Sequence, residues 1–192
     1  LAAIKKLVFE EGRIAKSALM AYLRNNFEGP EGEKVRQIIL NYAPKFGNDD
    51  DYVDKLLAEA YNCYIDELPQ YHTTRYGRGP VGCAYYAGTS SISANVPSGA
   101  VVPATPDGRK AFTPVAEGCS PTSGTDVLGP TAVFKSVSKL PTDKITGGVL
   151  LNQKLAPSAL STETGRQKPV SIISTFFADL HGWHVQYNIV SR

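Results

Sequence analysis

The side chains best suited to chemistry are a thiol, two imidazoles and a run of hydroxyls. Cys119 lies between Gly118 and Ser120 in a turn-rich stretch, a setting in which nucleophiles occur. No His is near it in sequence, and the carboxylate of Glu117 would raise the pKa of a thiol rather than lower it. We therefore expect Cys119 to be structural.

The two imidazoles belong to His181 and His184, three residues apart. That spacing serves metals when both residues lie on one helix, but Gly182 interrupts a helix between them. A zinc site also needs a third or fourth ligand, and none is near in sequence. We predict a helix end and a partly buried polar His, and no metal site.

The hydroxyls occur in residues 88–95, GTSSISAN, which hold four hydroxyl side chains and one amide in a predicted strand. Burying such groups costs free energy unless they are hydrogen-bonded, and a polar ligand would supply the partners. An exposed edge strand explains the composition equally well. Both interpretations stay open on composition alone.

Two glycine-containing motifs were considered as anion sites. Gly77 and Gly79 precede Pro80, which removes a backbone donor, so this is not a phosphate loop. Residues 106–109, PDGR, are typical of a β-turn. Arg109 suits either an anionic substrate or an ion pair with a neighbouring carboxylate, and we favour the ion pair.

Composition and charge restrict the class of protein. The 192 residues are 42% hydrophobic and 20% charged, which allows one domain or two small ones. A net charge of +2 argues against a nucleic-acid partner. No apolar run reaches the roughly 18 to 20 residues of a membrane span and no signal peptide opens the chain, so we expect a cytoplasmic protein. The three cysteines, an odd number, predict free thiols.

Helical periodicity dominates the first third, over residues 4–8, 19–27 and 33–42, with Ser17 as an expected cap. Residues 48–51, NDDD, predict the start of a further helix that Pro69 ends. Later we expect strands within 82–96, a short helix over 131–140 and a buried strand over 148–155. A helix starting at Pro169 and a strand over 183–190 complete the prediction.

Taken in order, seven motifs resemble the carboxy-terminal part of a glycyl radical enzyme. They are residues 48–53 (NDDDYV), 88–97 (GTSSISANVP), 104–110 (ATPDGRK), 117–121 (EGCSP), 129–139 (GPTAVFKSVSK), 150–154 (LLNQK) and 182–188 (GWHVQYN). The similarity is greatest to the branch with glycerol, propanediol and trans-4-hydroxyproline dehydratases and choline trimethylamine-lyase. The chain starts in a helical pattern and stops in a predicted strand, so we expect a piece of a longer polypeptide.

The resemblance implies an α/β fold, part of a ten-stranded α/β barrel of two half-barrels, with a helical N-terminal third. It implies that residues 1–125 end a pyruvate formate-lyase-like domain and that residues 126–192 begin a glycine radical domain. In this family a separate S-adenosylmethionine and iron–sulfur activating enzyme installs a glycyl radical, which generates a thiyl radical that attacks the substrate. No directly bound cofactor is implied.

The resemblance also limits which site residues belong to this chain. The thiyl Cys is expected upstream of Leu1 and the radical Gly beyond Arg192, so no catalytic residue is assigned and the fragment alone is expected to be inactive. Thr89, Ser90 and Ile92 are the predicted contacts to a small polar substrate, and Gln186 and Asn188 are expected to position backbone. A homodimer is implied. An acyltransferase of the formate C-acetyltransferase type and a non-catalytic scaffold are the alternatives.

Overall fold

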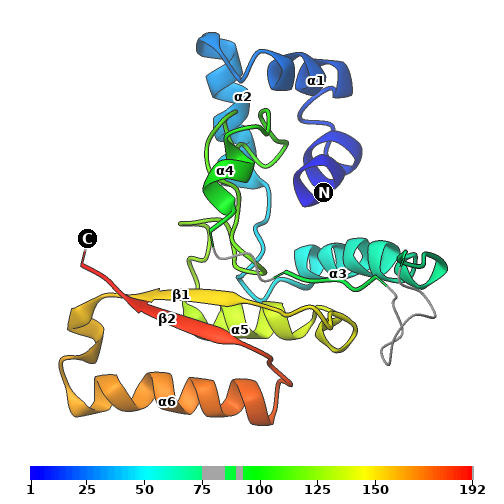
Figure 1. The fold of residues 1–192 in the computed structure, drawn as a ribbon. Coiled ribbons are helices and arrows are strands. Elements are labelled where there is room, and N and C mark those ends of the chain that lie inside the picture. The colour runs from blue at the N-terminus through cyan, green and yellow to red at the C-terminus, as the bar shows by residue number, and fades with distance from the viewer. Residues whose placement is uncertain (75–84, 90–92, 192) are drawn as a thin grey trace. The chain divides into compact units, whose positions relative to one another are not determined.

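The computed structural model describes residues 1–74, 85–89 and 93–191 (Figure 1). They form two compact units, each assembled from two separate stretches of the chain. The first unit contains Leu1–Lys45 and Ser93–Ala116, and the second contains Phe46–Ile92 and Glu117–Arg192. The turn-rich residues 104–131 are therefore divided between the two units. In the described part of the chain, no helix is both long and apolar enough to cross a membrane.

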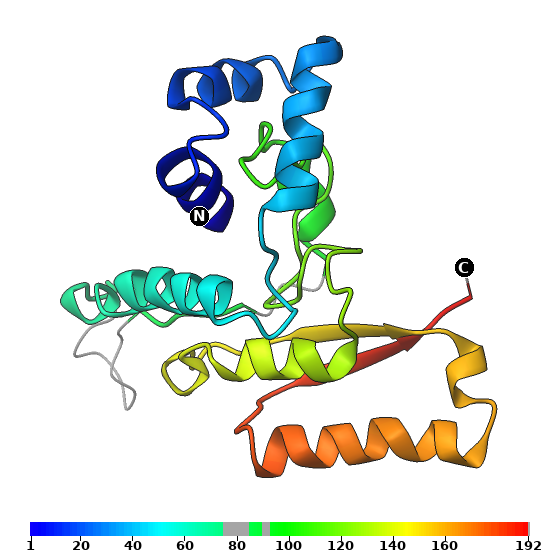
Figure 2. The ribbon, with the colours of Figure 1, turned by 180° about the vertical axis from the view of Figure 1, so that it is seen from behind.

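The first unit is built from helices and turns. Its elements are a π-helix, η1 (Ile4–Glu10), and the helices α1 (Lys16–Arg24), α2 (Gly29–Tyr42) and α4 (Asn95–Gly99). Figure 2 shows α1 and α2 from the side opposite to Figure 1. Apolar side chains at helical spacing meet in one core, formed by Ala3, Leu7, Ile14, Leu19, Phe27, Ile39, Ala43 and Ala104. The predicted helical first third is thus confirmed.

Two local predictions in this unit are wrong. Ser17 does not cap α1, because the helix already begins at Lys16 and Ala15 precedes it without a side-chain cap. Asn95 and Val96 were expected in a strand, yet they open α4, where Pro97 occupies the first turn. Of residues 82–94, the structure describes 85–89 and 93–94, and among these only Thr89 is bridged, to Val149, so most of the strand expected at these described residues is not formed.

The second unit combines helices with a parallel pair of strands. Its elements are α3 (Asp51–Ile65), η2 (Leu68–Gln70), α5 (Pro130–Ser138), η3 (Thr142–Lys144), β1 (Leu151–Leu155), η4 (Pro157–Leu160), α6 (Glu163–Ala178) and β2 (Val185–Ile189). The predicted helix after Pro130 and the predicted strands near 150 and 187 are confirmed. Pro130 suits the first helical position because its missing N–H would have no partner there.

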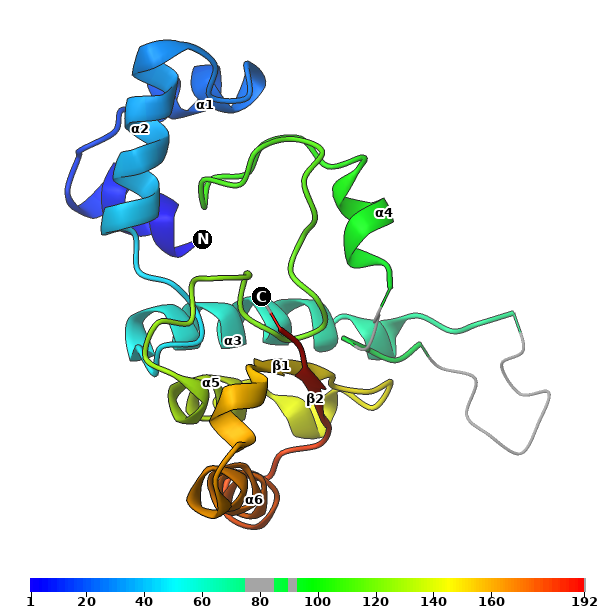
Figure 3. The same ribbon diagram turned by 90° about the vertical axis from the view of Figure 1, so that its left-hand side faces the viewer.

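The strands β1 and β2 are connected through α6 in a β–α–β arrangement. They pair in parallel, with Leu151 opposite Val185 and Leu155 opposite Ile189. Parallel strands require such a crossover connection, and a helix supplies it here. Figure 3 shows α5 and α6 on the same side of the strand pair. This arrangement confirms an α/β fold type. The ten-stranded barrel stays a prediction.

The core of the second unit lies between the strands and the helices. It contains Ile65, Ala87, Cys119, Val133, Phe134, Val137, Leu140, Ile145, Val149, Leu151 and Phe176. The rings of Phe134 and Phe176 are 4.5 Å apart between centroids and tilted by 48°. Contacts of this kind add to the free energy gained by burial. Helices α5 and α6 are thereby packed onto one face of the sheet.

The start of α6 differs from the prediction. Pro169 was expected to begin this helix, but it lies inside α6, which begins six residues earlier. The side chain of Thr162 accepts a hydrogen bond from the N–H of Gly165 at 3.0 Å, and Glu163 follows in the first turn. A capping oxygen and an acidic first turn both favour a helix start. Together they favour a helix start at Glu163 more than Pro169 disfavours an interior helical position by its missing N–H donor.

Candidate functional site

The segment from Gly118 to Ser120 is hydrogen-bonded to β1 and the residue before it. The N–H of Cys119 donates to the carbonyl of Leu150 at 2.9 Å, and the N–H of Asn152 donates to the Ser120 hydroxyl at 2.9 Å. Gly118 has a φ of +55°, and a Cβ there would lie 2.4 Å from the Leu150 carbonyl oxygen. Only glycine permits this approach.

Cys119 itself is held inside the core. Its side chain is 4% exposed, and the thiol donates to the carbonyl of Leu150 at 3.0 Å. Burial raises the pKa of Cys119 to about 12, so the thiolate that would act as a nucleophile is scarce at neutral pH. The geometry supports the structural role expected for this residue. Cys63 is an exposed free thiol, and Cys83 lies outside the described residues.

Of the three predicted substrate contacts, Thr89 falls within the described residues, and Ser90 and Ile92 do not. The N–H of Thr89 donates to Gly148 at 2.8 Å, and its carbonyl accepts from Leu150 at 3.2 Å, which pairs it with Val149. Paired residues of parallel strands point to the same face, so Thr89 shares a face with buried Val149. In the described structure the Thr89 hydroxyl is buried and has no hydrogen-bond partner. Substrate contact by these residues stays a prediction.

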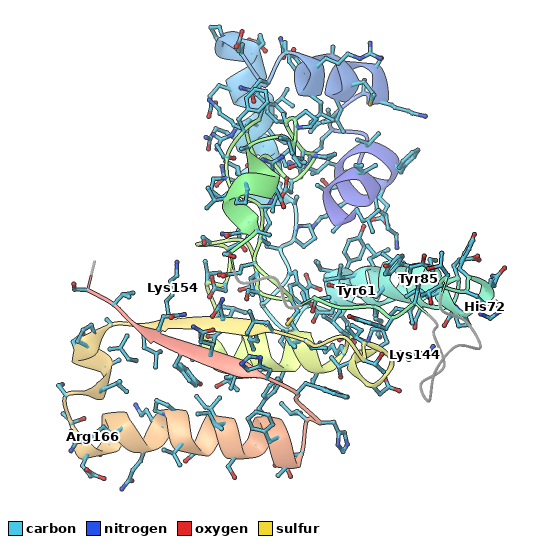
Figure 4. All side chains as sticks on the ribbon, viewed as in Figure 1. Tyr61, His72, Tyr85, Lys144, Lys154 and Arg166 are labelled. Atoms are coloured by element: carbon cyan, nitrogen blue, oxygen red, sulfur yellow. The ribbon has the colours of Figure 1, made fainter. Side chains whose placement is uncertain are left out.

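The opposite face of the strand pair carries amides. Asn188 Nδ2 donates to Asn152 Oδ1 at 3.2 Å, and Gln186 Nε2 donates to Asn188 Oδ1 at 3.4 Å. Lys154 lies on the same face, and in Figure 4 its side chain points away from α6. Asn152, Gln186 and Asn188 are half-buried and Lys154 is exposed. The sheet is therefore apolar toward the helices and polar on its other side.

An ionic network around the buried carboxylate of Asp54 joins α3 to α5. Lys139 Nζ lies 2.7 Å from Asp49 Oδ1, 2.7 Å from Asp51 Oδ1 and 3.0 Å from Asp54 Oδ2. Burial would lower the pKa of Lys139, but the hydrogen bonds to these three carboxylates outweigh it and raise that pKa. Burial raises the pKa of Asp54, against the hydrogen bonds from Lys139 and Ser136. The network is a structural connection between the two helices.

Among the described residues the guanidinium of Arg109 forms no ion pair, and only its backbone N–H donates to a carboxylate, that of Asp107, at 3.3 Å. Its guanidinium donates to the carbonyls of Lys110, Thr113, Val102 and Pro103. The ion pair that we favoured is therefore wrong, because four carbonyls of the surrounding turn already occupy its donors. Arg109 organises the turn of the first unit.

The two histidines lie in the connection between α6 and β2. His181 has a φ of +53° just after α6, and the N–H of Gly182 donates to the carbonyl of Phe176 at 2.8 Å. This is the helix end predicted from the sequence. The partly buried histidine that we expected is wrong, because both His181 and His184 are exposed. Over residues 1–74, 85–89 and 93–191, no group of three or more His, Cys, Asp or Glu could hold a metal ion.

Sequence reasoning missed the network around Lys139, although it noted the acidic residues as a helix start. Lys139 and Asp54 are 85 positions apart. The acidic residues among 48–51 are already explained by capping and by the charge preference of a helix N-terminus. Their sequence therefore does not indicate that a distant lysine pairs with them. Gln186 and Asn188 are expected from the sequence to position backbone, but the bond between Asn152 and Asn188 follows only from strand pairing.

Family models match nearly all of the chain. The model described as pyruvate formate lyase-like matches residues 1–99, which is more than half of the chain, and the model described as glycine radical matches residues 115–192. The two matches follow each other in the order that the motifs indicated.

Individual relatives agree with the family models. The probable dehydratase YbiW of Escherichia coli strain K12 is 65% identical over 192 residues, which are 100% of this chain and 24% of that protein. Trans-4-hydroxy-L-proline dehydratase of Clostridioides difficile is 37% identical over 100% of this chain and 23% of its own length. The chain thus spans about a quarter of these relatives.

A solved structure of a relative has the same fold. The glycerol-bound B12-independent glycerol dehydratase from Clostridium butyricum matches with a TM-score of 0.89 and 42% identity, over 99% of this chain and 23% of that one. Fold, motif order and family models therefore agree. The chain belongs to the pyruvate formate lyase-like family of glycyl radical enzymes, with relatives in its dehydratase branch.

Proposed function

We propose that the longer protein to which this chain corresponds is a glycyl radical lyase of the dehydratase type. It cleaves a C–O or C–N bond of a small polar substrate by thiyl-radical hydrogen abstraction. Two family models, pyruvate formate lyase-like and glycine radical, match this one chain one after the other, and its relatives include dehydratases. This observation carries the proposal. Residues 1–192 supply part of the scaffold, and the fragment alone is inactive.

In the proposed reaction a separate S-adenosylmethionine and iron–sulfur activating enzyme installs the glycyl radical. The radical glycine takes hydrogen from a cysteine, and the resulting thiyl takes hydrogen from the substrate carbon next to the leaving group. General acid–base groups then assist departure of water or an amine. Both radical residues lie outside residues 1–192, in agreement with the buried, hydrogen-bonded state of Cys119.

Several further features belong to the same proposal. The parent is a cytoplasmic homodimer, and this chain contributes to a ten-stranded barrel of two half-barrels. The boundary between the pyruvate formate-lyase-like and glycine radical domains is placed at residues 125 and 126, although the glycine radical match already begins at residue 115. Thr89, Ser90 and Ile92 contact the substrate, and the buried Thr89 hydroxyl without a partner among the described residues is compatible with a ligand contact.

The experiment is anaerobic activation of the full-length protein by its activating enzyme. Electron paramagnetic resonance checks for the glycyl radical, and the activated protein is assayed with hydroxyproline, glycerol, propanediol, choline and hydroxyalkyl sulfonates. We expect a radical signal and release of water or an amine from one substrate. A radical together with an activity that depends on formate and coenzyme A would indicate the acyltransferase instead. Absence of any radical would indicate a non-catalytic scaffold.

A further inference from the structure

The polar face of the β1–β2 pair has hydrogen-bonding capacity that the described chain does not use. The register places Asn152 opposite Gln186 and Lys154 opposite Asn188. Because side chains alternate along a strand, these four share one face. Leu151, Val185 and Tyr187 point to the other face and belong to the core or pack against it. Four polar side chains thus form a continuous surface, which we call the amide face.

Hydrogen bonds hold the three amides of this face in a chain. It runs from Gln186 Nε2 to Asn188 Oδ1, and from Asn188 Nδ2 to Asn152 Oδ1. The backbone N–H of Asn152 is also fixed, because it donates to the Ser120 hydroxyl. Every amide is therefore oriented by a neighbour before any ligand arrives, which lowers the entropic cost of binding.

The two ends of this chain differ in hydrogen-bonding character. At the Asn152 end, both N–H groups of Nδ2 have no partner in the described structure. At the Gln186 end, the oxygen Oε1 accepts no bond from any described residue. An amide carries two donors and a two-lone-pair acceptor, so the amide face offers a free donor beside a free acceptor on directly opposed residues.

A peptide group has the matching chemistry. It presents a carbonyl for the Asn152 donors and an N–H for the Gln186 oxygen, and in an extended segment one residue directs both groups the same way. An anion would be met by Asn152 and Lys154 but opposed by the carbonyl oxygen of Gln186. An apolar helix would leave half-buried amides unsatisfied, which costs about 1 to 3 kcal/mol per group.

We propose that the amide face binds the backbone of an extended segment of the parent polypeptide outside residues 1–192. The chain spans 24% and 23% of two relatives, so most of their length lies outside it. A segment of the same polypeptide has a high effective concentration at this face. A second copy is a poorer fit, because the centres of such interfaces are apolar and this face is polar. The inference does not depend on the proposed reaction.

The test is hydrogen–deuterium exchange of the full-length protein, read peptide by peptide. Asn152→Asp keeps the acceptor for Asn188 but removes both free donors, and Gln186→Leu removes the free acceptor. We expect either change to speed exchange about five- to tenfold in one peptide outside residues 1–192, as for loss of one net hydrogen bond. Exchange in the peptides that contain β1 and β2 should stay unchanged.

Two matched variants complete the experiment. Gln186→Glu and Gln186→Leu both lose the Nε2 donor to Asn188, but Glu keeps an acceptor, so exchange of the outside peptide should stay as in the wild type in the Glu variant and speed up in the Leu variant. Gln167→Leu removes an exposed amide of α6 that binds Glu163 and should also have no effect there. If Asn152→Asp fails to fold, the Leu and Glu variants of Gln186 decide. The proposal is overturned if no peptide outside residues 1–192 responds, if the response depends on protein concentration, or if it needs an added small polar ligand.

Discussion

The ammonium of Lys139 lies 3.0 Å from a carboxylate oxygen of Asp54, whose side chain has no exposed surface. The Ser136 hydroxyl donates to the same oxygen at 3.0 Å and accepts from the N–H of Asp49 at 2.9 Å. The second oxygen of Asp54 is buried and has no partner in the described part of the chain. Lys139 therefore supplies the positive charge that makes a buried carboxylate tolerable.

Replacing Lys139 by Met should destabilise the second unit by about 3 to 5 kcal/mol, because it leaves Asp54 buried without its cation. Urea unfolding followed by the fluorescence of Trp183, the single tryptophan of the chain, measures this change. Lys135→Met is the matched control, since Lys135 is more exposed and, within the described part of the chain, its ammonium pairs with Asp49 alone. It should cost less than about 1 kcal/mol. Equal losses in both variants would contradict the role assigned to Lys139.

The same network should give stability a two-part dependence on pH. Hydrogen bonds from Lys139 and Lys55 lower the pKa of Asp51 to about 2, so its contribution is complete above about pH 4 and is lost as pH falls toward 2. Burial raises the pKa of Asp54, so the folded state binds a proton before the unfolded state does, and stability rises as pH falls toward the unfolded pKa near about 4.

Thermal unfolding at a series of pH values measures this profile. We expect the midpoint temperature to rise slightly from pH 7 to mildly acidic pH and to fall below about pH 4. Asp54→Asn should remove the rise and keep the fall, because an amide has no proton to gain in this range. A profile of Asp54→Asn that follows the wild type would show that Asp54 does not titrate as described.

The close approach at Gly118 should make it intolerant of any side chain. Gly118→Ala places a methyl group 2.4 Å from the Leu150 oxygen and 2.8 Å from the Thr89 oxygen, at a φ of +55°. We expect a loss of more than about 3 kcal/mol in urea unfolding. Gly124→Ala is the control, because Gly124 has a φ of +83° but nothing within 4 Å. It should cost only about 1 to 2 kcal/mol, the left-handed conformation alone.

Cys119 should resist alkylation in the folded chain. Its pKa is raised to about 12 by burial, whereas Cys63 is exposed. With iodoacetamide at pH 8, peptide mass spectrometry should show fast labelling of Cys63 and labelling of Cys119 only after denaturation in urea. Labelling of native Cys119 as fast as Cys63 would mean that the thiol is accessible and ionised, which would reopen a nucleophilic role.

Local signals in the sequence were sufficient for most elements. The apolar spacing of α2 and α3, Pro130 at the start of α5, and the short apolar stretches around β1 and β2 each depend on neighbours within a few residues. Competing local signals caused the errors. Pro169 predicts a helix start, yet Thr162 supplies the cap, and Ser17 predicts a cap, yet α1 begins one residue before it.

The sequence by itself determined the family, the α/β type and the structural character of Cys119, because motif order and local periodicity are properties of the chain. Only the tertiary structure decided which distant groups meet. Lys139 reaches Asp54 across 85 positions, Asn188 reaches Asn152 across 36, and Arg109 binds carbonyls rather than a carboxylate. Such contacts depend on strand register and helix packing, which no local pattern specifies, so the amide face became visible only once β1 and β2 were paired.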